Sequence, residues 1–196
     1  LRARGFAMQS AVPVGEGAMA AVLGLGADAV TQLAADAAQG DVCQLANEND
    51  PTQNVISGSK AAVERAIAMA KDAGAKRALP LPVSAPFHCA LMQPAADEMA
   101  QALAAVNLQE PRVPIVSNVT ASAVETAAPI VDLLVQQITG RVRWMTSVEW
   151  MVAQGVTEFW EIGAGKALSG MIRRIHKDAT LRNVGAAVDV KAAVEG

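Results

Sequence analysis

Aromatic side chains are scarce in this 196-residue sequence, which has three Phe, three Trp and no Tyr, 3% in all. Proteins that bind single-stranded nucleic acids stack bases on aromatic rings set among basic residues. Here the net charge is −3, and the Lys and Arg residues are mostly scattered. The composition therefore argues against a nucleic-acid partner.

Cysteine and histidine are equally rare, with two of each. Cys43 and Cys89 lie far apart and, with the two histidines, show no zinc-site spacing, so neither a disulfide framework nor a metal site is expected. No uncharged apolar run reaches the roughly 18 residues that a membrane helix needs, and no signal peptide is visible. We expect a cytoplasmic protein with reduced thiols, no tightly bound cofactor and no membrane contact. At 52% hydrophobic residues, it should bury a core.

Residues 16–83 alternate strand-like and helical patterns in the order β-α-β-β-α-β, which is typical of a ferredoxin-like arrangement. A turn is expected at the polar cluster 47–52, and Ser59 is expected to cap the second helix. Gly74 follows that helix as a C-terminal glycine does. The expected strands are 18–23, 42–46, 53–57 and 75–83, and the expected helices are 27–38 and 60–73.

Outside this module, strands and helices also alternate, which predicts an α/β layer with a parallel sheet. Thr146 and Glu149 fit a capping box at the start of a helix. We expect one body formed by residues 1–15 and 84–196, into which residues 16–83 are inserted. Its expected helices are 1–12, 92–106, 129–138, 146–154, 167–176 and one from 188, and its expected strands are 113–119, 157–162 and 181–184.

His88 follows an apolar run closed by three prolines, between residues 79 and 92. It lies where the chain returns from the insert to the main body, and clefts between two bodies favour small-molecule sites. By position alone, a catalytic histidine and a histidine satisfied within a core are about equally supported. A Cys89–His88 pair is not expected, because adjacent residues of an extended segment point to opposite faces.

Two further motifs carry little weight. The turn 163–166, Gly-Ala-Gly-Lys, lacks the spacing of a nucleotide-binding loop, and a tight strand-to-helix turn is the better interpretation. Glu161 has no paired carboxylate at a telling spacing for acid–base chemistry. No GxSxG motif, the elbow that presents the serine of α/β acyl-transfer enzymes, occurs in the sequence.

Several stretches, in order and over nearly the whole chain, carry a resemblance to a known family. The most specific is the run from Ala75 to Met92; the others are Arg4-Gly5 with Met8-Gln9, 17–21, 47–58, 61–66, 113–118, Gln137 with Val142 and Trp144, 147–149, and 161–168. Together they resemble the malonyl-CoA:acyl-carrier-protein transacylase family of bacterial type II fatty-acid synthesis. The resemblance implies an α/β-hydrolase-like large subdomain carrying a ferredoxin-like small one.

The resemblance also implies an activity and its partners: transfer of a malonyl group from malonyl-CoA to the phosphopantetheine thiol of acyl carrier protein, through a malonyl-serine ester. His88 matches the catalytic histidine, and Gln137 matches the residue whose main-chain carbonyl orients that imidazole. Arg4 matches the arginine that holds the malonyl carboxylate in two hydrogen bonds. The remaining matched positions are Phe87, which crowds out a branched methylmalonyl group, and Asn118 and Asn49 near the cleft.

The sequence departs from the family pattern in two ways. Ala164 stands where many members have proline. The glycine-rich loop and serine elbow, which members carry before the equivalent of Arg4, have no counterpart here, and the chain begins in a helical pattern without Met. It is therefore expected to be N-terminally truncated. Three readings stay open: a part of a working transacylase, a non-catalytic fragment that folds or binds carrier protein or coenzyme A, and a portion of a multidomain synthase.

Overall fold

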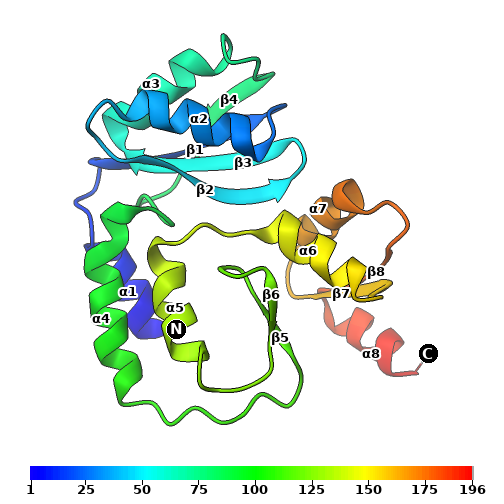
Figure 1. The fold of residues 1–196 in the computed structure, drawn as a ribbon. Coiled ribbons are helices and arrows are strands. Elements are labelled where there is room, and N and C mark those ends of the chain that lie inside the picture. The colour runs from blue at the N-terminus through cyan, green and yellow to red at the C-terminus, as the bar shows by residue number, and fades with distance from the viewer. Residues whose placement is uncertain (196) are drawn as a thin grey trace.

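The computed structural model describes residues 1–195 as a mixed α/β fold (Figure 1). Most of the predicted elements are confirmed, α2 to the residue and the others with shifted ends. In chain order they are α1 (Arg2–Ser10), β1 (Gly17–Leu23), α2 (Ala27–Ala38), β2 (Cys43–Asp50), β3 (Gln53–Ser59), α3 (Lys60–Ala70), β4 (Arg77–Pro80), the 3-10 helix η1 (Ala90–Met92), α4 (Gln93–Ala104), β5 (Ile115–Ser117), β6 (Ser122–Val124), α5 (Ile130–Thr139), α6 (Trp144–Ala153), β7 (Glu158–Ile162), α7 (Ala167–Ile175), β8 (Thr180–Val184) and α8 (Ala187–Glu195).

The predicted β-α-β-β-α-β order between residues 16 and 83 is confirmed. Its strands form one antiparallel sheet in the order β2-β3-β1-β4. Alternate residues of β1 separate the two faces: Ala20 and Val22 join the core beneath α2 and α3, whereas Met19 packs on the opposite face with Ala46 and Val55. In Figure 1, α2 and α3 cover the face turned away from the rest of the molecule.

The rest of the chain forms two groups on the other side of this sheet (Figure 1). One group is helical, with α4 packed on α1 and α5 around the buried residues Met8, Met92 and Ile138. The other contains α6, α7, α8 and the strands β7 and β8. The parallel sheet that we predicted is present in the described residues only as the pair β7–β8, because β5 pairs instead with the unpredicted β6 in an antiparallel hairpin.

The turn predicted at residues 47–52 is wrong for its first four residues. β2 continues through them to Asp50, with register shifts between Leu45 and Asn47 and between Glu48 and Asp50. Irregularities of this kind are common in edge strands, and they accommodate polar residues here. Glu48 and Asp50 form ion pairs with arginines that come later in the chain. Only Pro51 and Thr52 remain as the turn.

Both predicted side-chain caps are also wrong. The Ser59 hydroxyl donates to the Val42 carbonyl oxygen at 3.3 Å rather than capping α3. Thr146 lies inside α6, which begins two residues earlier, and its hydroxyl donates to Glu48 Oε2 at 3.3 Å. In both cases the hydroxyl donates to a residue distant in sequence instead of capping the helix next to it.

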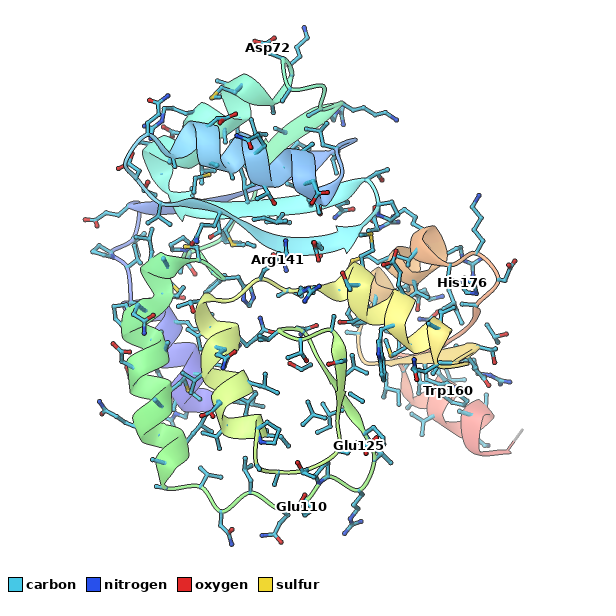
Figure 2. The ribbon with its side chains drawn as sticks, in the orientation of Figure 1. Asp72, Glu110, Glu125, Arg141, Trp160 and His176 are labelled. Carbon is cyan, nitrogen blue, oxygen red and sulfur yellow. The ribbon has the colours of Figure 1, made fainter. Side chains whose placement is uncertain are left out.

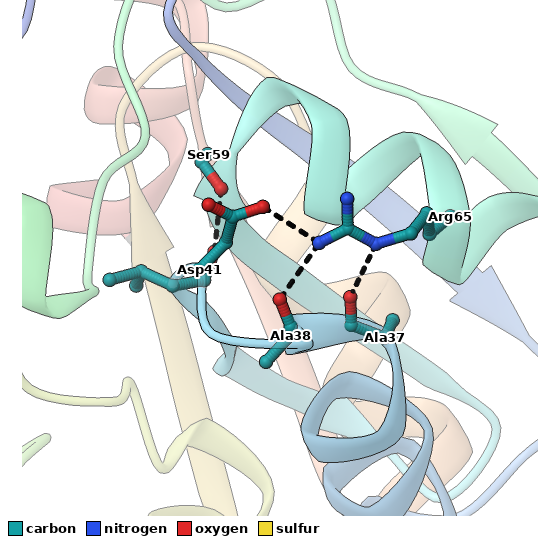
Figure 3. Close-up of polar contacts among 6 residues, drawn as sticks. Ala37, Ala38, Asp41, Ser59 and Arg65 are labelled. Atoms are coloured by element: carbon teal, nitrogen blue, oxygen red, sulfur yellow. Dashed lines mark hydrogen bonds and ion pairs between the residues drawn. The ribbon is translucent and has the colours of Figure 1, made fainter.

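Arg65 of α3 fastens the C-terminal end of α2 (Figure 3). Its Nε and Nη2 donate at 2.8 Å to the carbonyl oxygens of Ala37 and Ala38, and Nη2 also lies 2.7 Å from Asp41 Oδ2. The last carbonyls of a helix have no partner within it and carry partial negative charge, so a guanidinium is well suited to this end. The contact joins the two helices that cover the sheet.

Candidate active site

His88 lies in the loop between β4 and η1, in a backbone conformation that is uncommon for a residue with a side chain, φ +61°. Both neighbours fix the loop. Phe87 packs against two apolar clusters, one around Met8 and Met92 and one around Met19. Cys89 is fully buried, and its Sγ donates to the Pro86 carbonyl oxygen at 3.2 Å. Strained backbone persists where the surroundings over-determine it, and it clusters at functional sites. The segment around His88 is thus a turn, not the extended stretch that our argument about Cys89 assumed.

The His88 imidazole is held by α5. Its Nδ1 lies 3.0 Å from the main-chain oxygen of Gln137, and a carbonyl oxygen can only accept, so Nδ1 carries the proton. Nε2 is then the nitrogen that can accept a proton from a reacting group. The Gln137 side chain stays within its own turn, where Nε2 donates to the Gly140 carbonyl oxygen at 3.0 Å.

The pKa of His88 is lowered from its ordinary value, chiefly because burial disfavours the imidazolium. The carbonyls of Gln137 and Gly140 act in the opposite direction, and the positive charge of Arg4 lowers the pKa further. At neutral pH the side chain is therefore the neutral imidazole, the form that acts as a base.

Arg4 is on α1 and half-buried, close enough for its charge to act on His88. None of the ion pairs within residues 1–195 involves Arg4. A guanidinium in this state can receive a carboxylate from a ligand. Of the predicted site residues, Arg4, Phe87, His88 and Gln137 are brought together around one loop.

His88 lines a groove of about 500 Å³, which we call the His88 groove. Edge strand β2 and helix α2 line one side of the groove, and the end of α5 with the residues directly after it lines the other. Its other lining residues are Thr31, Ala35, Cys43, Gln44, Leu45, Thr139, Gly140 and Arg141. It lies between the four-stranded sheet and the later elements, as expected for a cleft between two bodies.

Asn118 and Asn49 are not in the His88 groove. Asn118 and Gln137 line a second, more apolar hollow of about 210 Å³, with Ile115, Val124 and Leu134 among its other walls. Asn49 lies in the irregular end of β2, half-buried, and lines neither hollow. Asn118 therefore shares a hollow with the residue that holds the His88 ring, whereas Asn49 does not line either hollow.

Cys43 is a residue of the groove that sequence reasoning did not place there, because no local pattern links β2 to a loop 45 residues later. A thiol beside a histidine invites comparison with a nucleophile. Burial, however, raises the pKa of Cys43 to about 11, so almost no thiolate exists at neutral pH. Burial also raises the pKa of Cys89. Neither cysteine fits the role of an activated nucleophile.

The turn 163–166 precedes the N-terminus of α7, and a protein carboxylate already fills the position where a phosphate would lie. Glu161 accepts from the backbone N–H groups of Leu168 and Ser169 at 3.1 and 2.8 Å, and from Asn183. These bonds, those from Ser169 foremost, lower the pKa of Glu161. Glu161 therefore acts as a helix cap. This geometry agrees with a tight turn rather than a nucleotide-binding loop.

The described residues contain neither a metal-binding cluster nor a membrane-spanning helix. No cluster of three or more His, Cys, Asp or Glu side chains in residues 1–195 is placed to hold a metal ion. Among the helices of the same residues, none has the length and apolar character needed to cross a membrane.

Comparison with known proteins gives a consistent set of relatives. The family model described as "Acyl transferase domain" matches residues 2–162. The malonyl CoA-acyl carrier protein transacylase of Escherichia coli K12 is 48% identical over 192 residues, which are 98% of this chain and 62% of the relative. The chain thus spans less than two thirds of that curated relative.

Solved structures match equally well. The acyl-carrier-protein-S-malonyltransferase of Bartonella henselae superposes with a TM-score of 0.94 at 51% identity, covering 99% of this chain and 62% of that one. A structure of a type II PKS acyl-carrier protein in complex with its malonyl-transacylase gives a TM-score of 0.94 at 43% identity, covering 98% and 62%. The predicted resemblance is confirmed, and so is the mixed α/β class.

Proposed function

The chain belongs to the acyl transferase domain family, and from that premise we propose that it forms the base-bearing part of a malonyl-CoA:acyl-carrier-protein transacylase of fatty-acid biosynthesis. The substrates in this proposal are malonyl-CoA and the phosphopantetheine thiol of acyl carrier protein. The curated and solved relatives support the choice of reaction, and the complex with a carrier protein supports the choice of partner.

The observation that carries the proposal is the contact between His88 Nδ1 and the Gln137 main-chain oxygen at 3.0 Å. A general base needs a fixed ring, a fixed tautomer and a pKa that keeps it neutral at working pH. The carbonyl supplies the first two, and burial supplies the third. A histidine merely satisfied within a core does not need to line a groove of about 500 Å³.

In the proposed reaction, His88 Nε2 takes the proton of a serine hydroxyl as that oxygen attacks the thioester carbon of malonyl-CoA. When the carbon–sulfur bond breaks, the imidazolium returns the proton to the sulfur of coenzyme A. The second half repeats these steps in reverse. His88 deprotonates the carrier-protein thiol, the thiolate attacks the malonyl-serine ester, and the serine oxygen leaves with the proton.

The other predicted residues take supporting roles in the proposal. The Arg4 guanidinium binds the malonyl carboxylate in two hydrogen bonds and so selects malonyl over acetyl groups. Phe87 limits the space beside the acyl carbon, which disfavours a methyl branch. Asn118 and Asn49 are assigned to the surroundings of the cleft only weakly, on their match to family positions.

The domain division belongs to the same proposal. We assign residues 16–83 to a ferredoxin-like small subdomain and residues 1–15 with 84–196 to an α/β-hydrolase-like large one. The antiparallel sheet order β2-β3-β1-β4 and the parallel pair β7–β8 support this division. The two unpaired thiols, Cys43 and Cys89, support a reducing compartment such as the cytoplasm.

No GxSxG motif occurs in the sequence, so we propose that the serine belongs to the part of the relatives that lies outside the match. The alternative is a fragment that folds and binds carrier protein or coenzyme A without catalysis. A transfer assay separates the two. It uses a chimera that joins this chain to the unmatched part of the Bartonella henselae malonyltransferase.

The chimera should malonylate acyl carrier protein, and His88→Asn in it should lower the rate by roughly 10²–10⁴-fold, the usual contribution of a general base. His176→Asn, which changes the other histidine, is the matched control and should leave the rate unchanged. A folded chimera that transfers no malonyl group would favour the non-catalytic alternative. Transfer at an equal rate without His88 would contradict its role as the base.

A further inference from the structure

Glu48 is a buried carboxylate in an edge strand, an unusual place for a charge. Its side chain is 8% exposed. Burying a carboxylate costs free energy unless charged or polar partners compensate for the lost water. Glu48 has two such partners, both on the segment that joins α5 to α6 or just beyond it. Arg141 Nη1 lies 3.2 Å from Oε1, and the Thr146 hydroxyl donates to Oε2 at 3.3 Å.

The backbone around Glu48 holds the same segment. Glu48 N donates to the Val142 carbonyl oxygen at 2.9 Å, and Val142 N donates to the Ala46 carbonyl oxygen at 2.8 Å. Val142 thereby adds a single-residue parallel bridge to the free edge of β2. Figure 2 shows Arg141 directly beside β2, between the sheet and the elements below it.

Two hydrogen bonds connect this segment to the His88 imidazole. Gly140 precedes Arg141, and its carbonyl oxygen accepts from Gln137 Nε2 at 3.0 Å. The Gln137 main-chain oxygen in turn accepts from His88 Nδ1 at 3.0 Å. Gly140 N also donates to the Gln136 carbonyl oxygen at 2.8 Å, which closes the end of α5 against the same turn. A shift of residues 140–142 would therefore move the carbonyl that fixes the His88 tautomer.

We infer that Glu48 is a positioning residue for His88: through Arg141, Thr146 and Val142 it anchors the end of α5 that holds the imidazole in its Nδ1–H form. Glu48 itself touches neither His88 nor the reacting atoms in this assignment. The inference rests on the proposed function only in treating His88 as the base. It is tested on the tautomer in this chain without substrate, so its failure is distinguishable from a failure of the transfer assay.

The test is ¹⁵N NMR of the imidazole nitrogens in this chain at a pH where His88 is neutral, with the His88 signals assigned by loss in His88→Asn. Glu48→Ala should lower the ratio of the Nδ1–H to the Nε2–H tautomer of His88 about 3- to 10-fold, the factor that the loss of one net hydrogen bond implies. Glu48→Gln keeps one acceptor oxygen, which can serve Arg141 or Thr146 but not both as the two carboxylate oxygens do, and should restore part of the ratio.

Asp50→Ala is the matched control. Asp50 is also a buried carboxylate of β2 with an arginine partner, but that partner is Arg174 of α7, at 2.7 Å. Asp50→Ala should lower the melting temperature and leave the His88 tautomer unchanged. An unchanged ratio in folded Glu48→Ala, or an equal change in both variants, overturns the inference. If Glu48→Ala does not fold, Arg141→Met decides: a lowered ratio supports the anchor and an unchanged ratio overturns it.

Discussion

At the level of single residues, the proposed reaction depends on a neutral His88. Its lowered pKa predicts an NMR titration midpoint below about 6.5, the ordinary value for histidine. Between the lowered pKa and about 6.5 the unfolded chain binds more protons than the folded one, so the free energy of unfolding falls as the pH drops through this window. His88→Gln should remove this part of the acid dependence. A midpoint at or above the ordinary value would contradict the burial argument.

Arg4 carries the second prediction at this scale. In the chimera, Arg4→Ala should lower kcat/KM for malonyl-CoA by about 10- to 100-fold, because a charged hydrogen-bonding group for the carboxylate is lost. Transfer from acetyl-CoA, which has no such carboxylate, should change little. Arg2→Ala, on the same helix but exposed and stacked over Phe6, is the control and should affect neither substrate. Equal losses for both substrates would count against the carboxylate-binding role.

At the scale of elements, Arg65 makes the contact between α2 and α3 testable. Arg65→Met keeps much of the aliphatic stem but removes the bonds to the end of α2, and should lower the free energy of unfolding by about 1–2 kcal/mol. Lys60→Met is the matched control on α3. Its ammonium lies 3.9 Å from Glu64 with both side chains about 60% exposed, so the loss should stay below about 0.5 kcal/mol. Equal losses in urea unfolding would refute the special role of Arg65.

Local patterns sufficed for elements bounded by glycine, such as α2, which runs from Ala27 to Ala38 as predicted. They failed where a distant partner decides the structure. The polar end of β2 reads as a turn in the sequence, because the charges of Glu48 and Asp50 are typical of a loop. In the structure these charges pair with Arg141 and Arg174 and are kept in a strand. The hairpin of β5 and β6 was missed because its second strand has only three residues, too few for a periodic signal.

The candidate site divides in the same way. The prolines before His88 predict that it lies in a loop. Its contact with Gln137, 49 residues away, is predicted only by the resemblance to a family. No pattern in the sequence predicted that Cys43 and Arg141 would line the same groove. Such neighbours come from packing of β2 against α6 and against the segment around Val142, which local spacing does not encode.

At the scale of the whole molecule, large apolar side chains stand exposed away from the sheet. Ile162 is 77% exposed, Phe6 63% and Ile115 48%, and the chain spans 62% of the length of its E. coli relative. A segment that packs over these side chains would remove their apolar surface from water. We expect this chain to bind an apolar fluorescent dye and the chimera to bind less per molecule and melt higher. Undiminished dye binding by a folded chimera would show that the unmatched part does not cover these residues.

The most direct test of the central claim is the intact mass of the protein after incubation with malonyl-CoA, for this chain and for the chimera. We expect no change for this chain, in which we propose a base and a carboxylate-binding arginine but find no serine elbow. For the chimera we expect a gain of one malonyl group, which is removed on addition of acyl carrier protein. A malonyl adduct on this chain alone, or none on a folded chimera, would contradict the division of the site proposed for His88 and its missing nucleophile.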